Sequence, residues 1–92
     1  MMKRIEDTQQ LGQWIRAERK AQGLRQPDLA AAAATSVRFI VEIERGKPTA
    51  QIGKVLQVLQ QLGIGLAIDG LTANPEADRA GSLGDDAPGA GG

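Results

Sequence analysis

Helix-breaking signals at regular intervals restrict most of this 92-residue chain to a series of short helices. Gly23, Thr35–Ser36, Arg45–Pro48 and Gly63 each end a segment whose apolar residues recur at the spacing of one helix face. Four helices are therefore predicted. They run from Thr8 to about Gln22, from Gln26–Pro27 through Leu29–Ala33, from Ser36 to about Glu44, and from Thr49 to Gly63.

Polar residues at the predicted helix starts support this division. A side chain there can accept from the exposed N–H groups of the first turn. The residues at these positions are Asp7 or Thr8, Gln26, Ser36 and Thr49. We therefore expect an all-α domain over residues 8–63, preceded by an N-terminal arm at residues 1–7.

The pattern changes from helical to alternating after Gly63. Apolar and small residues then alternate, which is typical of a strand whose apolar residues are Ile64, Leu66 and Ile68. Every other apolar segment is predicted to be helical, so this strand, at residues 64–69, is expected to pair with its copy in a homodimer. The alternatives are an extended fourth helix or an irregular segment. Residues 70–92, dominated by Gly, Ala, Asp and Pro, predict a disordered acidic tail.

The composition excludes several kinds of chemistry. The chain has no Cys and no His, which removes disulfides, thiolate nucleophiles, the usual zinc ligands and histidine acid–base catalysis. We therefore expect no enzyme activity, no metal and no cofactor. No segment approaches the roughly 20 apolar residues that span a bilayer, and the acidic, polar N-terminus is unlike a signal peptide. A cytoplasmic protein without a membrane partner is expected.

Charge is unevenly distributed, although the formal net charge is zero. Residues 1–54 hold ten of the eleven basic residues against six acidic ones, a net charge of about +4, while residues 69–92 are net acidic. A basic nucleic-acid-binding face followed by an acidic tail has this asymmetry. The alternative is that both segments are ordinary solvated surface, and on charge alone we favour this alternative.

The second and third predicted helices have the form of a helix-turn-helix motif, whose second helix enters the major groove of DNA. The residues resemble the Cro/C1-type (XRE) family of phage and bacterial repressors over about residues 8–63. The resemblance rests on Gly23–Ala30, Ala33, Ser36, Ile40 and Ile43–Lys47. Within that family, a HipB-like antitoxin branch is indicated by Val37–Ile40, Glu44–Ala50 and Ile64–Ile68. The family implies a lambda-repressor-like bundle of four to five helices with a short intermolecular C-terminal strand.

The resemblance also implies which side chains contact DNA. Arg38, which opens the third helix with Ser36 and Val37, is the candidate for reading guanine, because its planar fork matches O6 and N7. Val37 would contact a thymine methyl, and Gln26 would donate to a backbone phosphate. The full set of candidate DNA-binding residues is Arg25, Gln26, Ser36, Val37, Arg38, Glu42, Arg45 and Lys47.

Two positions depart from the family pattern, and one pair follows it. Ala34 stands where the family has a turn glycine, so the second helix is expected to extend through the alanine run and to reshape the turn. Glu42 places an acid on the groove face, where it repels phosphate unless it accepts from cytosine N4. Arg19 and Glu44 occupy positions that the family pairs as a partly buried salt bridge.

These features predict a homodimeric repressor that binds an inverted repeat in double-stranded operator DNA. The HipB-like branch implies in addition an antitoxin that represses its own operon and binds a HipA-like kinase toxin. The alternatives are a stand-alone XRE-type regulator and a protein-interaction module that does not bind DNA.

Overall fold

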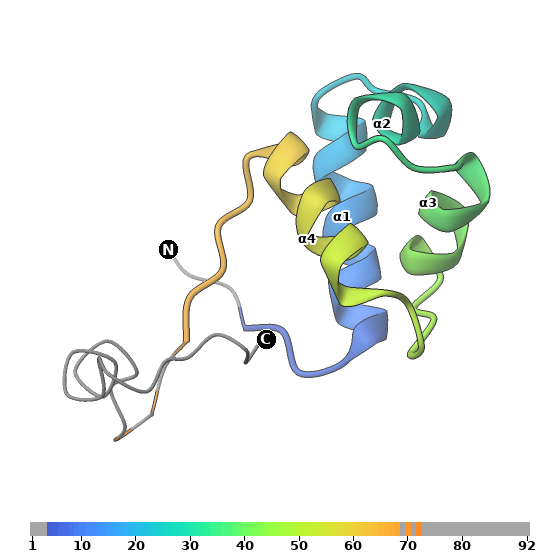
Figure 1. Ribbon diagram of the computed structural model, residues 1–92. Coiled ribbons are helices and arrows are strands. Elements are labelled where there is room, and N and C mark those ends of the chain that lie inside the picture. The colour runs from blue at the N-terminus through green and yellow to red at the C-terminus, as the bar shows by residue number, and fades with distance from the viewer. Residues whose placement is uncertain (1–3, 69, 71, 73–92) are drawn as a thin grey trace, which may run out of the picture.

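Four helices form the folded part of the molecule (Figure 1). The structure is a computed structural model that describes residues 4–68, 70 and 72. The helices are α1 (Thr8–Ala21), α2 (Gln26–Ala32), α3 (Val37–Glu44) and α4 (Ile52–Leu62). Helix α3 packs against α1 and α2, and α4 packs against the same two helices from another side. The predicted all-α helix-turn-helix bundle is confirmed.

Each helix contributes one fully buried side chain to a common core. These side chains are Ile15, Leu29, Ile40 and Val58. They belong to a larger buried cluster that also contains Ile43 of α3 and Leu59 of α4. Because burying one such side chain stabilises the fold by about 1.5–3 kcal/mol, these contacts hold α3 on α1 and α2.

The caps of α1 and α3 are those that the sequence predicts. Asp7 Oδ1 accepts from the Gln10 N–H at 2.8 Å, and Ser36 Oγ accepts from the Phe39 N–H at 3.0 Å. Thr8 has a different role, because its hydroxyl donates to the Gly46 carbonyl at 2.7 Å. This bond ties the start of α1 to the turn that follows α3.

The caps predicted for α2 and α4 are wrong. Arg25, not Gln26, precedes α2, and its N–H donates to Asp28 Oδ2 at 2.8 Å. Thr49 lies in a turn, and α4 begins only after Gln51, whose extended backbone is the N-cap. The chain needs these additional residues to cross from the end of α3 to the start of α4, with Ala50 half-buried on the way.

The expected extension of α2 through the alanine run is also wrong. Helix α2 ends at Ala32, and Ala34 adopts the left-handed conformation, with φ of +56°. The turn closes with two hydrogen bonds, from the Ala34 N–H to the Ala31 carbonyl at 3.2 Å and from the Thr35 N–H to the Ala30 carbonyl at 2.9 Å. Burial of Leu29 and Ile40 on either side holds the turn in this shape. The fold thus overrides the ordinary preference of alanine for backbone conformations with negative φ.

Gly12 allows α1 to approach the end of α3 closely. A Cβ atom built on Gly12 would lie 2.7 Å from the Glu44 carbonyl oxygen and closer still to that of Ile43. Both oxygens belong to backbone, so they cannot move aside as a flexible side chain would. A glycine within a helix is unfavourable by itself. The close contact between α1 and the end of α3 explains why a glycine occupies this position.

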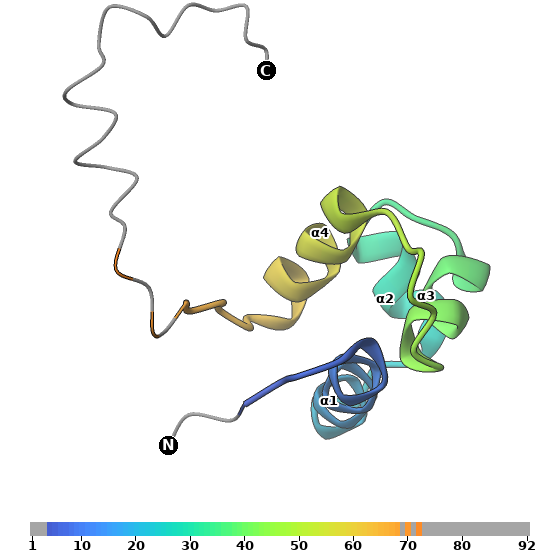
Figure 2. The ribbon, with the colours of Figure 1, turned by 90° about the horizontal axis from the view of Figure 1, so that it is seen from below.

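Residues 64–68 leave α4 on the side of the molecule opposite α3 (Figures 1 and 2). Gly63 ends α4 in the left-handed conformation, so the alternative of an extended fourth helix is wrong. The described residues contain no strand. Pairing of residues 64–68 with a second copy therefore stays a prediction. The acidic tail predicted at residues 70–92 lies outside the described residues, apart from Gly70 and Thr72.

Candidate nucleic-acid interface

Helix α3 divides its side chains between the core and the solvent. Ile40 and Ile43 are buried, whereas Val37 is 42% exposed and the Arg38 side chain is 85% exposed. Ser36 and Arg45 are exposed at the two ends of the helix. The outward face therefore presents an apolar group and a guanidinium at its N-terminal end and basic groups at its C-terminal end.

A buried ion pair fixes α3 relative to α1. Arg19 Nε lies 2.7 Å from Glu44 Oε2, and Arg19 Nη2 donates to Glu44 Oε1 at 3.0 Å. A third donation, from Arg19 Nη1 to the Leu24 carbonyl at 2.9 Å, ties the same guanidinium to the loop before α2. The hydrogen bond to Glu44 raises the pKa of Arg19 above its ordinary value. Paired charge-assisted bonds of this kind set geometry strictly, so the predicted partners Arg19 and Glu44 lie together and join three segments.

Gln26 joins the same network. Its side-chain amide donates to Glu44 Oε1 at 3.1 Å, and the residue is half-buried. An amide carries two N–H donors, so one serves Glu44 and the other stays for a ligand. The buried pair thus orients the residue that the sequence assigns to a phosphate.

A second set of charges lies on the outward face of α3. We call Arg38, Glu42 and Lys47 the Glu42 cluster. Arg38 Nε donates to Glu42 Oε2 at 3.2 Å, and Lys47 Nζ donates to Glu42 Oε1 at 3.1 Å. The hydrogen bonds from Lys47 and then Arg38 lower the pKa of Glu42 below its ordinary value. Glu42 is therefore ionised near neutral pH and is engaged by two of the candidate DNA-binding residues.

Arg25 lies apart from this cluster, at the start of α2. Its exposed guanidinium forms an ion pair with Asp28, with Nε 3.4 Å from Oδ2. Hydrogen bonds from the Arg25 backbone and side chain lower the pKa of Asp28. The candidate residues thus lie in three places, namely the start of α2, the outward face of α3 and the turn after α3.

Lys54 is a basic residue that the sequence analysis missed. It lies in the first turn of α4, exposed, with Nζ 5.8 Å from the centroid of the Phe39 ring of α3. A lysine at the positive end of a helix dipole is unfavourable. The sequence does not give this signal, because a helix that begins at Thr49, as predicted, puts Lys54 beyond its first turn. The Phe39 contact places its charge beside α3.

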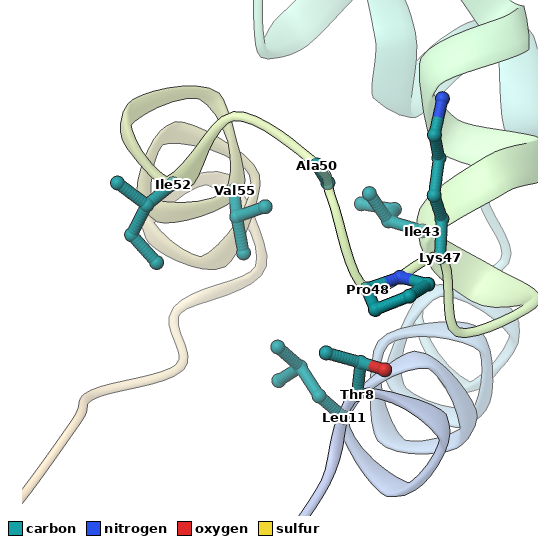
Figure 3. A pocket seen from close by; sticks show the side chains of 8 residues that line it. All are labelled: Thr8, Leu11, Ile43, Lys47, Pro48, Ala50, Ile52 and Val55. Carbon is teal, nitrogen blue, oxygen red and sulfur yellow. The ribbon is translucent and has the colours of Figure 1, made fainter.

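A small apolar hollow lies between the start of α1, the turn after α3 and the start of α4 (Figure 3). Its volume is about 120 Å³, and it is lined by Thr8, Leu11, Ile43, Lys47, Pro48, Ala50, Ile52 and Val55. Sites for drug-sized ligands measure about 300–1,000 Å³. The hollow is therefore too small for an effector of that size.

The bundle, its two-helix motif and the exposed basic face define a helix-turn-helix protein. The helix-turn-helix family model matches residues 15–68. The chain is 56% identical over 68 residues to the uncharacterized HTH-type transcriptional regulator y4mF of Sinorhizobium fredii (strain NBRC 101917 / NGR234), which is 74% of this chain and 90% of that protein. The chain therefore belongs to the helix-turn-helix family of transcriptional regulators, and the resemblance to XRE-type proteins is confirmed.

Solved structures with the same fold include HipB in two complexes. The HipB–O4 20mer complex matches with a TM-score of 0.70 and 18% identity, over 77% of this chain and 100% of the matched chain. The HipA–HipB–O2–O3 complex matches with a TM-score of 0.71, the same identity and the same coverage. At this identity the matches show the fold.

Within the described part of this chain, none of the helices is long and apolar enough to cross a membrane.

Proposed function

We propose that this chain is a sequence-specific repressor that inserts α3 into the major groove of operator DNA. The observation that carries the proposal is the position of Arg38, 85% exposed at the start of a helix whose other face is buried. A helix about 10–12 Å in diameter fits a groove about 12 Å wide. Since α3 is held by the core and by the Arg19–Glu44 pair, it meets the groove as a rigid unit.

We assign roles to the individual residues from the family resemblance and from the chemistry of their side chains. Arg38 reads guanine, Val37 contacts a thymine methyl, and the Ser36 hydroxyl, whose oxygen already caps α3, donates to a base or phosphate. The residues at the start of α2 and after α3 contact phosphates and set the register of the protein on DNA. These residues are Arg25, Gln26, Arg45 and Lys47.

A homodimer is part of the proposal. Leu66 is 62% exposed and Ile68 is 78% exposed, and Ile52 on α4 is 69% exposed. Burial of these exposed apolar side chains against a partner would be favourable. Residues 64–68 lie opposite α3, so pairing through Ile64, Leu66 and Ile68 leaves both copies of α3 open to DNA (Figure 2).

The finer proposal is that the repressor is the antitoxin of a HipA-like kinase toxin, acting in the bacterial cytoplasm at the nucleoid. It is supported by the HipB fold match, which includes a HipA–HipB complex. A stand-alone regulator is the second candidate, favoured by the 56% identity to y4mF, which is named as an HTH-type transcriptional regulator. Co-purification of the chain with the product of an adjacent kinase-like gene distinguishes the two candidates.

Selection from random-sequence DNA tests the main proposal. Purified protein is incubated with a library of random duplexes, and the bound fraction is amplified and sequenced over several rounds. We expect an inverted repeat with half-site centres about 34–36 Å apart, one turn of the duplex. A bound pool that stays random would contradict sequence-specific binding and would favour a protein-interaction module.

A further inference from the structure

Glu42 is an acidic residue on the surface that we propose to face DNA. Phosphates repel a carboxylate at this place, so its presence lowers affinity for DNA of any sequence. It lies four residues after Arg38, on the outward side of α3, and its side chain is 30% exposed. Its contacts indicate what it does there.

The carboxylate divides its two oxygens between two cations. Oε2 accepts from Arg38 Nε at 3.2 Å and Oε1 accepts from Lys47 Nζ at 3.1 Å. Lys47 reaches this place because its backbone N–H donates to the Glu42 carbonyl at 3.1 Å, which folds the turn back over the end of α3. The backbone of the turn thus holds Lys47 close to Glu42, and the length of the lysine side chain is not the only reason that the three charges lie together.

The contact with Glu42 also restricts Arg38. A guanidinium has five N–H donors, of which Nε carries one. With Nε on Glu42, the two terminal amino groups stay available, and two such donors match O6 and N7 of guanine. Without the carboxylate, a side chain that is 85% exposed is free to follow the nearest phosphate instead.

We infer that Glu42 is a specificity-determining residue, which positions Arg38 for a guanine and keeps Arg38 and Lys47 from binding DNA of arbitrary sequence. The inference rests on the proposed function, since it assumes that α3 faces DNA. The cluster carries two positive charges and one negative charge, so it offers phosphates a net charge of +1 in place of +2. An incorrect duplex must break the Arg38–Glu42 and Lys47–Glu42 pairs before its phosphates can bind these two cations, whereas the correct duplex leaves the Arg38–Glu42 pair in place.

Replacing Glu42 by Gln separates specific from non-specific binding. The variant neutralises about one more phosphate, so its plot of log affinity against log salt becomes steeper by about one. At 0.1 M salt this corresponds to roughly five- to tenfold tighter binding of a scrambled duplex. The selected duplex gains less, because Arg38 loses its positioning contact. The ratio of the two affinities should therefore fall by roughly fivefold.

The experiment uses the full chain as wild type, Glu42→Gln and Glu18→Gln. Fluorescence anisotropy measures binding of the selected duplex and of a scrambled duplex of the same composition. The salt concentration is varied from about 50 to about 200 mM, a range that brackets physiological ionic strength. Glu18 is the matched control, because it makes the same charge change on α1, where the structure gives its side chain a hydrogen bond from Gln22. We expect the Glu18→Gln protein to keep the wild-type ratio.

Each outcome separates this inference from the proposed function. If the wild type binds both duplexes equally, the proposed function fails and this inference fails with it. If the wild type discriminates and Glu42→Gln discriminates equally well, the inference alone is overturned. An equal loss in Glu18→Gln also overturns it, because bulk charge then explains the effect.

Independently of DNA, the Arg38 Nε–H signal in NMR spectra should be protected from exchange in the wild type and lose that protection in Glu42→Gln. An unprotected wild-type signal contradicts the geometry.

Discussion

Ala34→Gly should stabilise the protein. Ala34 has φ of +56°, where the Cβ atom of an L-residue is strained by about 1–2 kcal/mol, and glycine removes this strain. The Ala34 side chain is exposed, so its removal costs no core packing. Glycine also makes the unfolded chain more flexible, and this effect offsets about 0.4–1 kcal/mol of the stabilisation. The net gain is about 0.5–1 kcal/mol, or a rise in Tm of roughly 2–8 °C for a domain of this size.

Thermal unfolding followed by circular dichroism, at a fixed protein concentration, measures this gain. Ala31→Gly is the matched control, because Ala31 is exposed within α2, where glycine costs about 1 kcal/mol. The two substitutions are chemically identical and three residues apart, yet they should shift Tm in opposite directions. Equal destabilisation by both would refute the left-handed turn and restore the expectation of a longer second helix.

Three further predictions concern the packing and the dimer. Gly12→Ala should lower the free energy of unfolding by about 1–3 kcal/mol through overlap with backbone oxygens, whereas Gly53→Ala, with nothing within 4 Å, should be neutral or stabilising in the same urea titration. Glu44→Ala should cost about 3–5 kcal/mol because Arg19 is left buried without its partner; a loss below about 1 kcal/mol would show that water replaces the carboxylate. Leu66→Pro should yield helical monomers that no longer bind the selected duplex, and sedimentation as a dimer at micromolar concentration would exclude residues 64–68 as the seam.

The sequence predicts those elements whose signals are local. Caps such as Asp7 and Ser36 act within one turn, and the inward position of Ile40 follows from helical period alone. The start of α4 was misplaced because Thr49 is a good capping residue, but the path from α3 to α4 needs a longer connection. Ala34 was misjudged because intrinsic preference opposes left-handed alanine, whereas core packing on both sides of the turn enforces it.

The sequence names the candidate residues, whose contacts with DNA stay a prediction, but it gives little of their interactions with one another. Sequence spacing suggests an Arg38–Glu42 pair on one helix face, yet Lys47 reaches Glu42 only through the backbone of the following turn. The Gln26–Glu44 hydrogen bond links two helices and has no local signal. Gly12 was missed for the same reason, because the contact that requires it comes from the end of α3.

Competition binding with Arg38→Ala tests the central claim that α3 reads DNA sequence. The selected and scrambled duplexes compete for the protein at fixed salt, and Arg16→Ala, which removes an exposed arginine from α1, serves as the control. The account predicts that Arg38→Ala loses about 1–3 kcal/mol of discrimination, roughly 5- to 150-fold, while Arg16→Ala keeps the wild-type preference. An Arg38→Ala protein that discriminates as well as the wild type would contradict the claim.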